Sequence, residues 1–205
     1  MSSPIRSERL PCDAYKKYAD LAFEYHIAAV MLWETIIDCP YLYNPFMFLS
    51  RHTIELLLKG IIMRYCSEEE RHMITVNNKL KPIDSIHALS SLWNHYVLNG
   101  RDNQQSLFQE EEEKRIADTI TWIEKKDFSS TYYRYPFKHD GTRLKIEPIT
   151  ISKNALVSPA LGQKAVYIAE DMERVDIIKT GAEELRRGAS ILESIEMLFG
   201  IIEAP

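Results

Sequence analysis

Three charged residues about one helical turn apart, with a histidine next to the first, interrupt an otherwise apolar stretch of the sequence. Arg51, Glu55 and Lys59 follow one another at intervals of four residues, and His52 is adjacent to the first. At about 100° per residue, these side chains fall within an arc of roughly 100° on one helix face. We call them the polar stripe. Burying charge is costly unless it is paired, so the stripe predicts either an internal ion-pair network or a functional site.

The polar stripe allows two interpretations. In the structural one, Arg51, Glu55 and Lys59 form successive ion pairs that hold the helix against its neighbours. In the functional one, Arg51 and Lys59 contact phosphate, while Glu55 orients or neutralises them. His52 would then carry a proton. His87, near the predicted start of a later helix, joins this cluster if the two helices pack together.

A second candidate site lies in an aromatic segment later in the chain. Arg134 and His139 are separated by four residues, with Pro136 between them and no helical periodicity around them. A histidine there suits general acid or base catalysis at a ribose 2′-hydroxyl, with the arginine holding the phosphate. Tyr133 and its aromatic neighbours suit stacking on single-stranded bases. In the alternative interpretation, Arg134 pairs with a carboxylate among packed aromatic side chains and His139 lies on a loop surface.

Composition and missing motifs exclude several classes of protein. The chain has 205 residues and a net charge of −5, which suits one domain with no global bias toward nucleic acid. Cys12, Cys39 and Cys66 lack the spacing of a disulfide framework or a zinc site. The sequence contains no GxGxxG, P-loop, HExxH or GxSxG motif, so we expect neither a metal nor a cofactor.

The ends and apolar runs of the chain predict a cytoplasmic protein that does not engage a membrane. The N-terminal residues lack the apolar core of a signal peptide. The longest apolar run contains the polar stripe, and no run of transmembrane length is free of charge.

Hydrophobic periodicity predicts five helices. They cover about 13–38, 44–66, 86–99, 106–126 and 171–202. Asn44 and Pro45 are predicted as the cap and the first residue of the second helix. Asp84 or Ser85 is predicted to cap the third helix.

The segments between these helices are predicted to be loops, with one exception. The segment 67–82 is charged and then polar, so we expect a loop there. An irregular or β-hairpin insertion is predicted over 128–168, because the Asp140-Gly141 turn signal precedes alternating residues. The sequence thus predicts a single all-α domain over 1–205. It is a bundle of about five helices, with a flexible N-terminus over 1–12 and a small insertion before the last helix.

Three short motifs in this sequence resemble bacterial members of the HEPN superfamily. They are the run from Arg51 to Lys59, the run His87-Ala88-Leu89 leading a helix, and Tyr133-Arg134-Tyr135-Pro136. The resemblance covers about 13–200 and implies a helical bundle, often dimeric. Many such proteins act in toxin–antitoxin, phage-defence or RNA-processing systems. The active ones are metal-independent ribonucleases with an Arg-x(4–6)-His motif, usually near a helix start, and others are non-catalytic binding modules.

Two functional hypotheses follow. The first is a non-catalytic HEPN-like module that binds a phosphate-bearing ligand, either RNA or a nucleotide, or a partner protein. The candidate ligand-binding residues are Arg51, Glu55, Lys59, His87 and Tyr133. The second is a metal-independent ribonuclease that uses an Arg/His pair. Its candidate catalytic residues are Arg134, His139 and His52.

Assembly and geometry separate these hypotheses. A homodimer is the expected assembly, because twofold dimers are the commonest closed oligomers and the long helices offer wide apolar faces. An enzyme requires arginine and histidine side chains that converge in an open cleft. A binding module instead allows these side chains to be paired internally.

Overall fold

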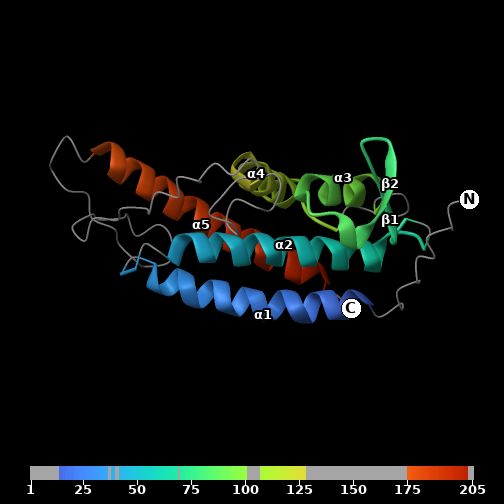
Figure 1. Ribbon diagram of the computed structural model, residues 1–205, viewed down its shortest axis with the longest axis horizontal. Coiled ribbons are helices and arrows are strands. Elements are labelled where there is room, and N and C mark those ends of the chain that lie inside the picture. The colour runs from blue at the N-terminus through green and yellow to red at the C-terminus, as the bar shows by residue number, and fades with distance from the viewer. Residues whose placement is uncertain are drawn as a thin grey trace, which may run out of the picture.

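The computed structural model describes residues 14–36, 38–39, 42–68, 70–100, 107–127 and 175–202, and the side chains of all of these except 175–182. These residues form five α-helices and one antiparallel two-stranded sheet, in the order α1, α2, β1, β2, α3, α4, α5 (Figure 1). The fold is therefore an all-α bundle, as the periodicity predicts, and it carries a small β-hairpin.

The helices in the described residues agree with the sequence prediction in number and order, and their bounds differ from it by a few residues. Their bounds are Ala14–Thr35 for α1, Tyr43–Tyr65 for α2, Leu89–Asn99 for α3, Glu110–Asp127 for α4 and Val175–Ile202 for α5. α2 is preceded by Leu42, so Asn44 lies inside the first turn and does not cap the helix. Burial of Tyr43, whose ring centroid is 6.3 Å from that of Phe46, extends the helix past the expected cap.

α3 begins three residues later than predicted. Residues Ile83–Ser85 form a short 3₁₀ turn, and Ile86 is extended, with φ −95° and ψ 121°. Ala88 then occupies the N-cap position without a side-chain hydrogen bond to the helix. His87 therefore lies in the connection just before α3, where its backbone carbonyl and its side chain are both available to α2.

α2 occupies the middle of the bundle. It contacts α1, α3 and α5, and Figure 1 shows it running between α1 on one side and α3 and α4 on the other. A helix surrounded in this way is buried around most of its circumference. Any charged residue in its central turns must therefore find its partners inside the protein.

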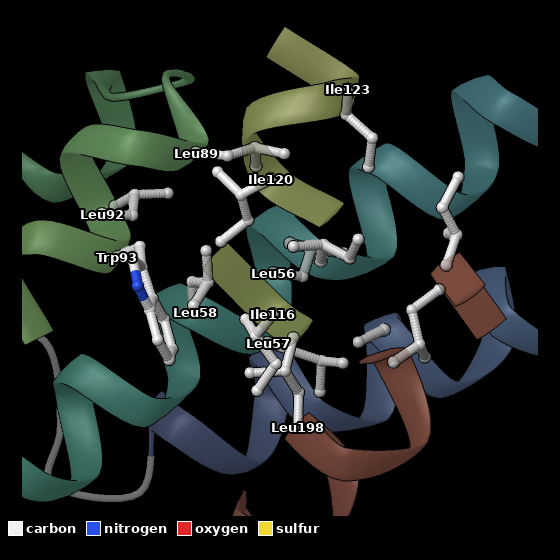
Figure 2. Close-up of a cluster of buried hydrophobic side chains, with 14 of the residues drawn as sticks. Leu56, Leu57, Leu58, Leu89, Leu92, Trp93, Ile116, Ile120, Ile123 and Leu198 are labelled. Carbon is white, nitrogen blue, oxygen red and sulfur yellow. The ribbon is translucent and has the colours of Figure 1, made fainter. Parts of the chain in front are cut away.

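The core joins α2 to the helices that cover it. Figure 2 shows side chains from α2, α3, α4 and α5 meeting there: Leu56, Leu57, Leu58, Leu89, Leu92, Trp93, Ile116, Ile120, Ile123 and Leu198. Burying one leucine or isoleucine side chain fully stabilises a protein by about 1.5–3 kcal/mol. This apolar packing is what holds α3 and α4 over the polar stripe of α2.

None of the helices in the described ranges combines the length and the hydropathy needed to cross a membrane. α2 is long enough, at 23 residues, but Arg51, Glu55 and Lys59 lie within it.

A β-hairpin lies where the sequence analysis predicts a loop, and that prediction is wrong. β1 (Met73–Val76) pairs with β2 (Lys79–Pro82), and Val76 lies opposite Lys79. Asn77 and Asn78 form the two-residue turn with φ of 52° and 59°, a conformation that asparagine tolerates better than most residues. The strands are too short for alternation to be visible in the sequence.

The insertion predicted over 128–168 and the N-terminus over 1–12 lie outside the described residues.

α1 and α5 approach closely at Gly188. A Cβ atom at this position would overlap the ring of Trp33, which is itself packed on Phe46 with 4.9 Å between ring centroids. We expect Gly188→Ala to lower the free energy of unfolding by about 1–3 kcal/mol, because the ring has little room to move. Urea unfolding followed by circular dichroism measures this change.

Gly200→Ala is the matched control for this prediction. No described atom lies within 4 Å of a Cβ built at Gly200 in the same helix. The control should be stabilising by up to about 1 kcal/mol, because alanine has the higher helix propensity. Equal effects of the two substitutions would contradict the close packing at Gly188.

Candidate functional site

Three members of the polar stripe form a buried ion-pair network. Arg51 Nη1 lies 3.2 Å from Glu55 Oε2, and Lys59 Nζ lies 2.9 Å from Glu55 Oε1. The exposed fractions of Arg51, Glu55 and Lys59 are 1%, 1% and 4%. The four-residue spacing brings the three groups together, and the packing of α3 and α4 over α2 removes them from water.

The Arg51 side chain links α2 to two other parts of the fold. Its Nη2 donates a hydrogen bond to the backbone carbonyl of His87 at 2.5 Å. Its Nε lies 3.5 Å from Asp127 Oδ2, at the end of α4, as an ion pair without hydrogen-bond geometry. Arg51 is among the largest fully buried side chains in the described part of the protein. It therefore connects three segments that are far apart in the sequence.

His87 joins the network from the connection before α3. Its Nδ1 lies 2.9 Å from Glu55 Oε1, while 51% of its side chain is exposed. Since the carboxylate of Glu55 accepts hydrogen bonds, this contact favours the tautomer with the proton on Nδ1. Nε2 of that tautomer is a proton acceptor. The contact expected from packing of the two helices is thus present.

Glu55 is ionised in this environment. Burial acts to raise the pKa of its carboxyl group, but the ammonium group of Lys59 and the hydrogen bonds from Lys59 and His87 outweigh burial and lower it. Arg51 and Lys59 contribute two positive charges, and Glu55 and Asp127 contribute two negative ones. The network is therefore balanced when His87 is neutral.

A second layer of contacts ties the network to α1. Lys59 Nζ lies 3.4 Å from the backbone carbonyl of Asp84, and the Tyr18 hydroxyl donates a hydrogen bond to the Asp84 carboxylate. Burial raises the pKa of Tyr18, and the hydrogen bond and the charge of Asp84 raise it further. The phenol therefore stays protonated and keeps donating. Sequence reasoning assigned Asp84 only as a helix cap.

His52 faces a different part of the bundle from Arg51. Its ring meets Tyr25 of α1 edge-on, with 4.7 Å between centroids, and stacks on Phe48 at 6.1 Å. Arg51 instead faces His87 and Asp127. The two adjacent side chains do not converge, so the paired arrangement that the enzyme hypothesis requires is not formed by Arg51 and His52.

Tyr133, Arg134 and His139 lie outside the described residues.

The described ranges give no support to a metal site or to thiol chemistry at Cys66. No group of three or more histidine, cysteine, aspartate or glutamate side chains is arranged there to hold a metal ion. Cys66 is buried, and burial, with a further contribution from Glu70, raises the pKa of its thiol to about 12 despite the opposing charge of Arg71. Such a thiol is protonated at neutral pH and is a poor nucleophile.

Two residues of the network were missed by sequence reasoning. Asp127 is 76 positions from Arg51, and Asp84 is 25 positions from Lys59. No local pattern marks either residue as a partner, since the contacts depend on how α4 and the 3₁₀ turn pack on α2.

Comparison of the chain with models of protein families, with curated proteins and with solved structures finds no match.

Proposed function

We propose that this protein is a non-catalytic HEPN-like binding module that acts in the cytoplasm as a homodimer, within a phage-defence or toxin–antitoxin system. The observation that carries the proposal is the internal pairing of Arg51, Glu55 and Lys59, which are at most 4% exposed. Paired in this way, the two cations serve the fold and are not presented to a substrate. Internal pairing is what a binding module allows and what an enzyme using these groups does not.

The ligand is proposed to be an RNA or a nucleotide that contacts His87 through a phosphate. His87 reaches the surface from the network, with 51% of its side chain exposed. When Nε2 is also protonated, the His87 ring keeps its Nδ1 contact with Glu55 and donates a charge-assisted hydrogen bond from Nε2 to a phosphate oxygen. Arg51 fixes the backbone of His87 and Glu55 fixes its ring, so both position the contact without touching the ligand. A cognate protein is the alternative ligand of the same module.

We expect His87→Gln to weaken binding of phosphate-bearing ligands by about 10–100-fold, the effect of one hydrogen bond to a charged group. Fluorescence anisotropy at low salt, with a labelled single-stranded RNA and a labelled nucleoside triphosphate, measures the dissociation constants. His95→Gln is the matched control. His95 lies in α3, and its Nε2 and Nδ1 lie at hydrogen-bond distance from the Glu70 carbonyl and the Asn99 amide.

Each result of the binding experiment has a distinct meaning. Weaker ligand binding by His87→Gln, together with normal binding by His95→Gln, supports the proposed contact. Equal loss in both variants contradicts it. Absence of binding by the folded wild-type protein rejects RNA and nucleotides as ligands, and leaves the cognate protein.

A metal-independent ribonuclease is the second candidate function. It is favoured by the hydrogen bond between Glu55 and His87, since a carboxylate that orients a histidine is a common arrangement for general acid–base catalysis. Arg134 and His139 remain the candidate pair with the family spacing.

The two candidates are separated by incubating the purified protein with labelled RNA in the presence of EDTA. Products with 2′,3′-cyclic phosphate ends that disappear in His139→Ala, His52→Ala or His87→Gln would establish the ribonuclease and identify its histidine. Intact RNA after incubation with folded protein would reject it.

A further inference from the structure

The outer face of α1 carries exposed apolar side chains. Phe23 is 52% exposed, Ile27 is 45% exposed and Met31 is 64% exposed, at successive intervals of four residues. Figure 1 shows α1 at the edge of the bundle, with α2 on its inner side. Apolar side chains grouped on one exposed helix face are typical of an interaction surface.

The same face has the spacing of a helix-packing seam. Its positions follow intervals of four and three residues: Lys16, Asp20, Phe23, Ile27, Val30 and Glu34. We call these six residues the α1 seam. Val30 is half-buried and the other five are exposed. The apolar members lie in the middle, a lysine lies at the N-terminal end and a glutamate at the C-terminal end.

We propose that the α1 seam packs antiparallel against the α1 seam of a second copy of this chain. An antiparallel twofold axis near residue 25 places Phe23 opposite the partner's Ile27 and Lys16 opposite the partner's Glu34. Both pairs occur twice, as an isologous interface requires. The proposal rests on the homodimer of the proposed function and assigns its surface and register.

Charge selects the antiparallel orientation. A parallel pair in register would bring lysine against lysine at one end and glutamate against glutamate at the other. In the antiparallel pair, a lysine faces a glutamate at both ends. These opposite charges favour the antiparallel orientation more than they add affinity. Asp20 falls opposite the partner's Val30 and is the one charged seam member that faces no opposite charge.

Sedimentation velocity over a range of protein concentrations tests this interface. We expect a dimer for the wild-type protein and a dissociation constant at least 100-fold higher for Ile27→Arg, because the charged side chain replaces the apolar contact with the partner's Phe23 at the centre of the seam. Leu98→Arg is the matched control, since Leu98 is 70% exposed on α3, outside the seam. Its dissociation constant should equal that of the wild type.

Three further variants test the register. Lys16→Glu should weaken the dimer, and adding Glu34→Lys should restore it, because the double substitution exchanges the two charges. Asp20→Leu should strengthen the dimer, because leucine replaces a charge opposite the partner's Val30. All these positions are exposed in the monomer, and circular dichroism verifies that each variant is folded.

The outcomes distinguish this proposal from the homodimer itself. A wild-type protein that stays monomeric at its highest soluble concentration overturns both. A dimer that Ile27→Arg and the charge exchange leave intact overturns the α1 seam alone and moves the interface to another surface. A dimer that Ile27→Arg dissociates but the charge exchange does not restore overturns the antiparallel register.

Discussion

Replacing Arg51 by alanine is expected to lower the free energy of unfolding by about 3–5 kcal/mol, the usual cost of breaking a buried ion pair from one side. The substitution leaves the carboxylates of Glu55 and Asp127 with less positive charge beside them, and it removes the donor to the His87 carbonyl. Urea unfolding at neutral pH, followed by circular dichroism, measures the loss.

Arg115→Ala is the control for the Arg51 prediction. Arg115 lies 3.4 Å from Glu111 and 3.7 Å from Glu193, but 52% of its side chain is exposed. Exposed pairs contribute about 0–1 kcal/mol, so this substitution should have little effect. Arg51→Met retains much of the buried stem of the side chain and removes the charge. It should therefore lower the free energy of unfolding by nearly as much as Arg51→Ala. An unchanged stability in Arg51→Ala would refute the structural role of the network.

Replacing Glu55 by glutamine is expected to destabilise the protein at pH 7 by a similar amount, about 3–5 kcal/mol. Glu55 is the carboxylate that Arg51, Lys59 and His87 share, at 3.2, 2.9 and 2.9 Å. The glutamine side chain keeps the shape and one carbonyl oxygen but removes the negative charge. Two buried cations then remain beside the single carboxylate of Asp127.

The pH dependence of stability identifies the charge of Glu55 as the cause. The folded protein holds the pKa of Glu55 below its ordinary value of 4.5, so the unfolded chain binds more protons in this range. The stabilisation is therefore complete above pH 4.5 and is lost as the pH falls below that value toward the lower pKa of the folded state. In Glu55→Gln this part of the acid dependence should be absent.

Urea unfolding between neutral and acidic pH, with Glu111→Gln as the control, measures this difference. Glu111 has a side chain that is 79% exposed, so its substitution should leave the acid dependence as in the wild type. If Glu55→Gln lost stability on acidification as steeply as the wild type, Glu55 would not be the titrating group.

The Arg51 and Glu55 variants also bear on function. A network that stabilises the fold explains why two cations of the polar stripe are inside the protein. It also explains how His87 is held in one orientation at the surface. Binding by His87→Gln therefore has to be compared with stability. A variant that unfolds like the wild type but binds weakly would place the ligand contact at His87.

The sequence by itself determined the local features of this protein. The number and order of the helices in the described ranges follow from hydrophobic periodicity, which depends on residues three and four positions apart. The ion pairs from Arg51 to Glu55 and from Glu55 to Lys59 follow from the same spacing. Helix geometry alone brings such side chains together, whatever the rest of the chain does.

Only the tertiary structure decided which of these groups leave water and which partners they meet. Arg51 and His52 are adjacent, yet about 100° of helix rotation turns one toward Asp127 and the other toward Tyr25. The partners from α4 and from the connection before α3 are distant in sequence, and no local pattern encodes them. Whether a charged stripe becomes a buried network or an open site depends on the elements that pack over it, and that packing is a property of the whole chain.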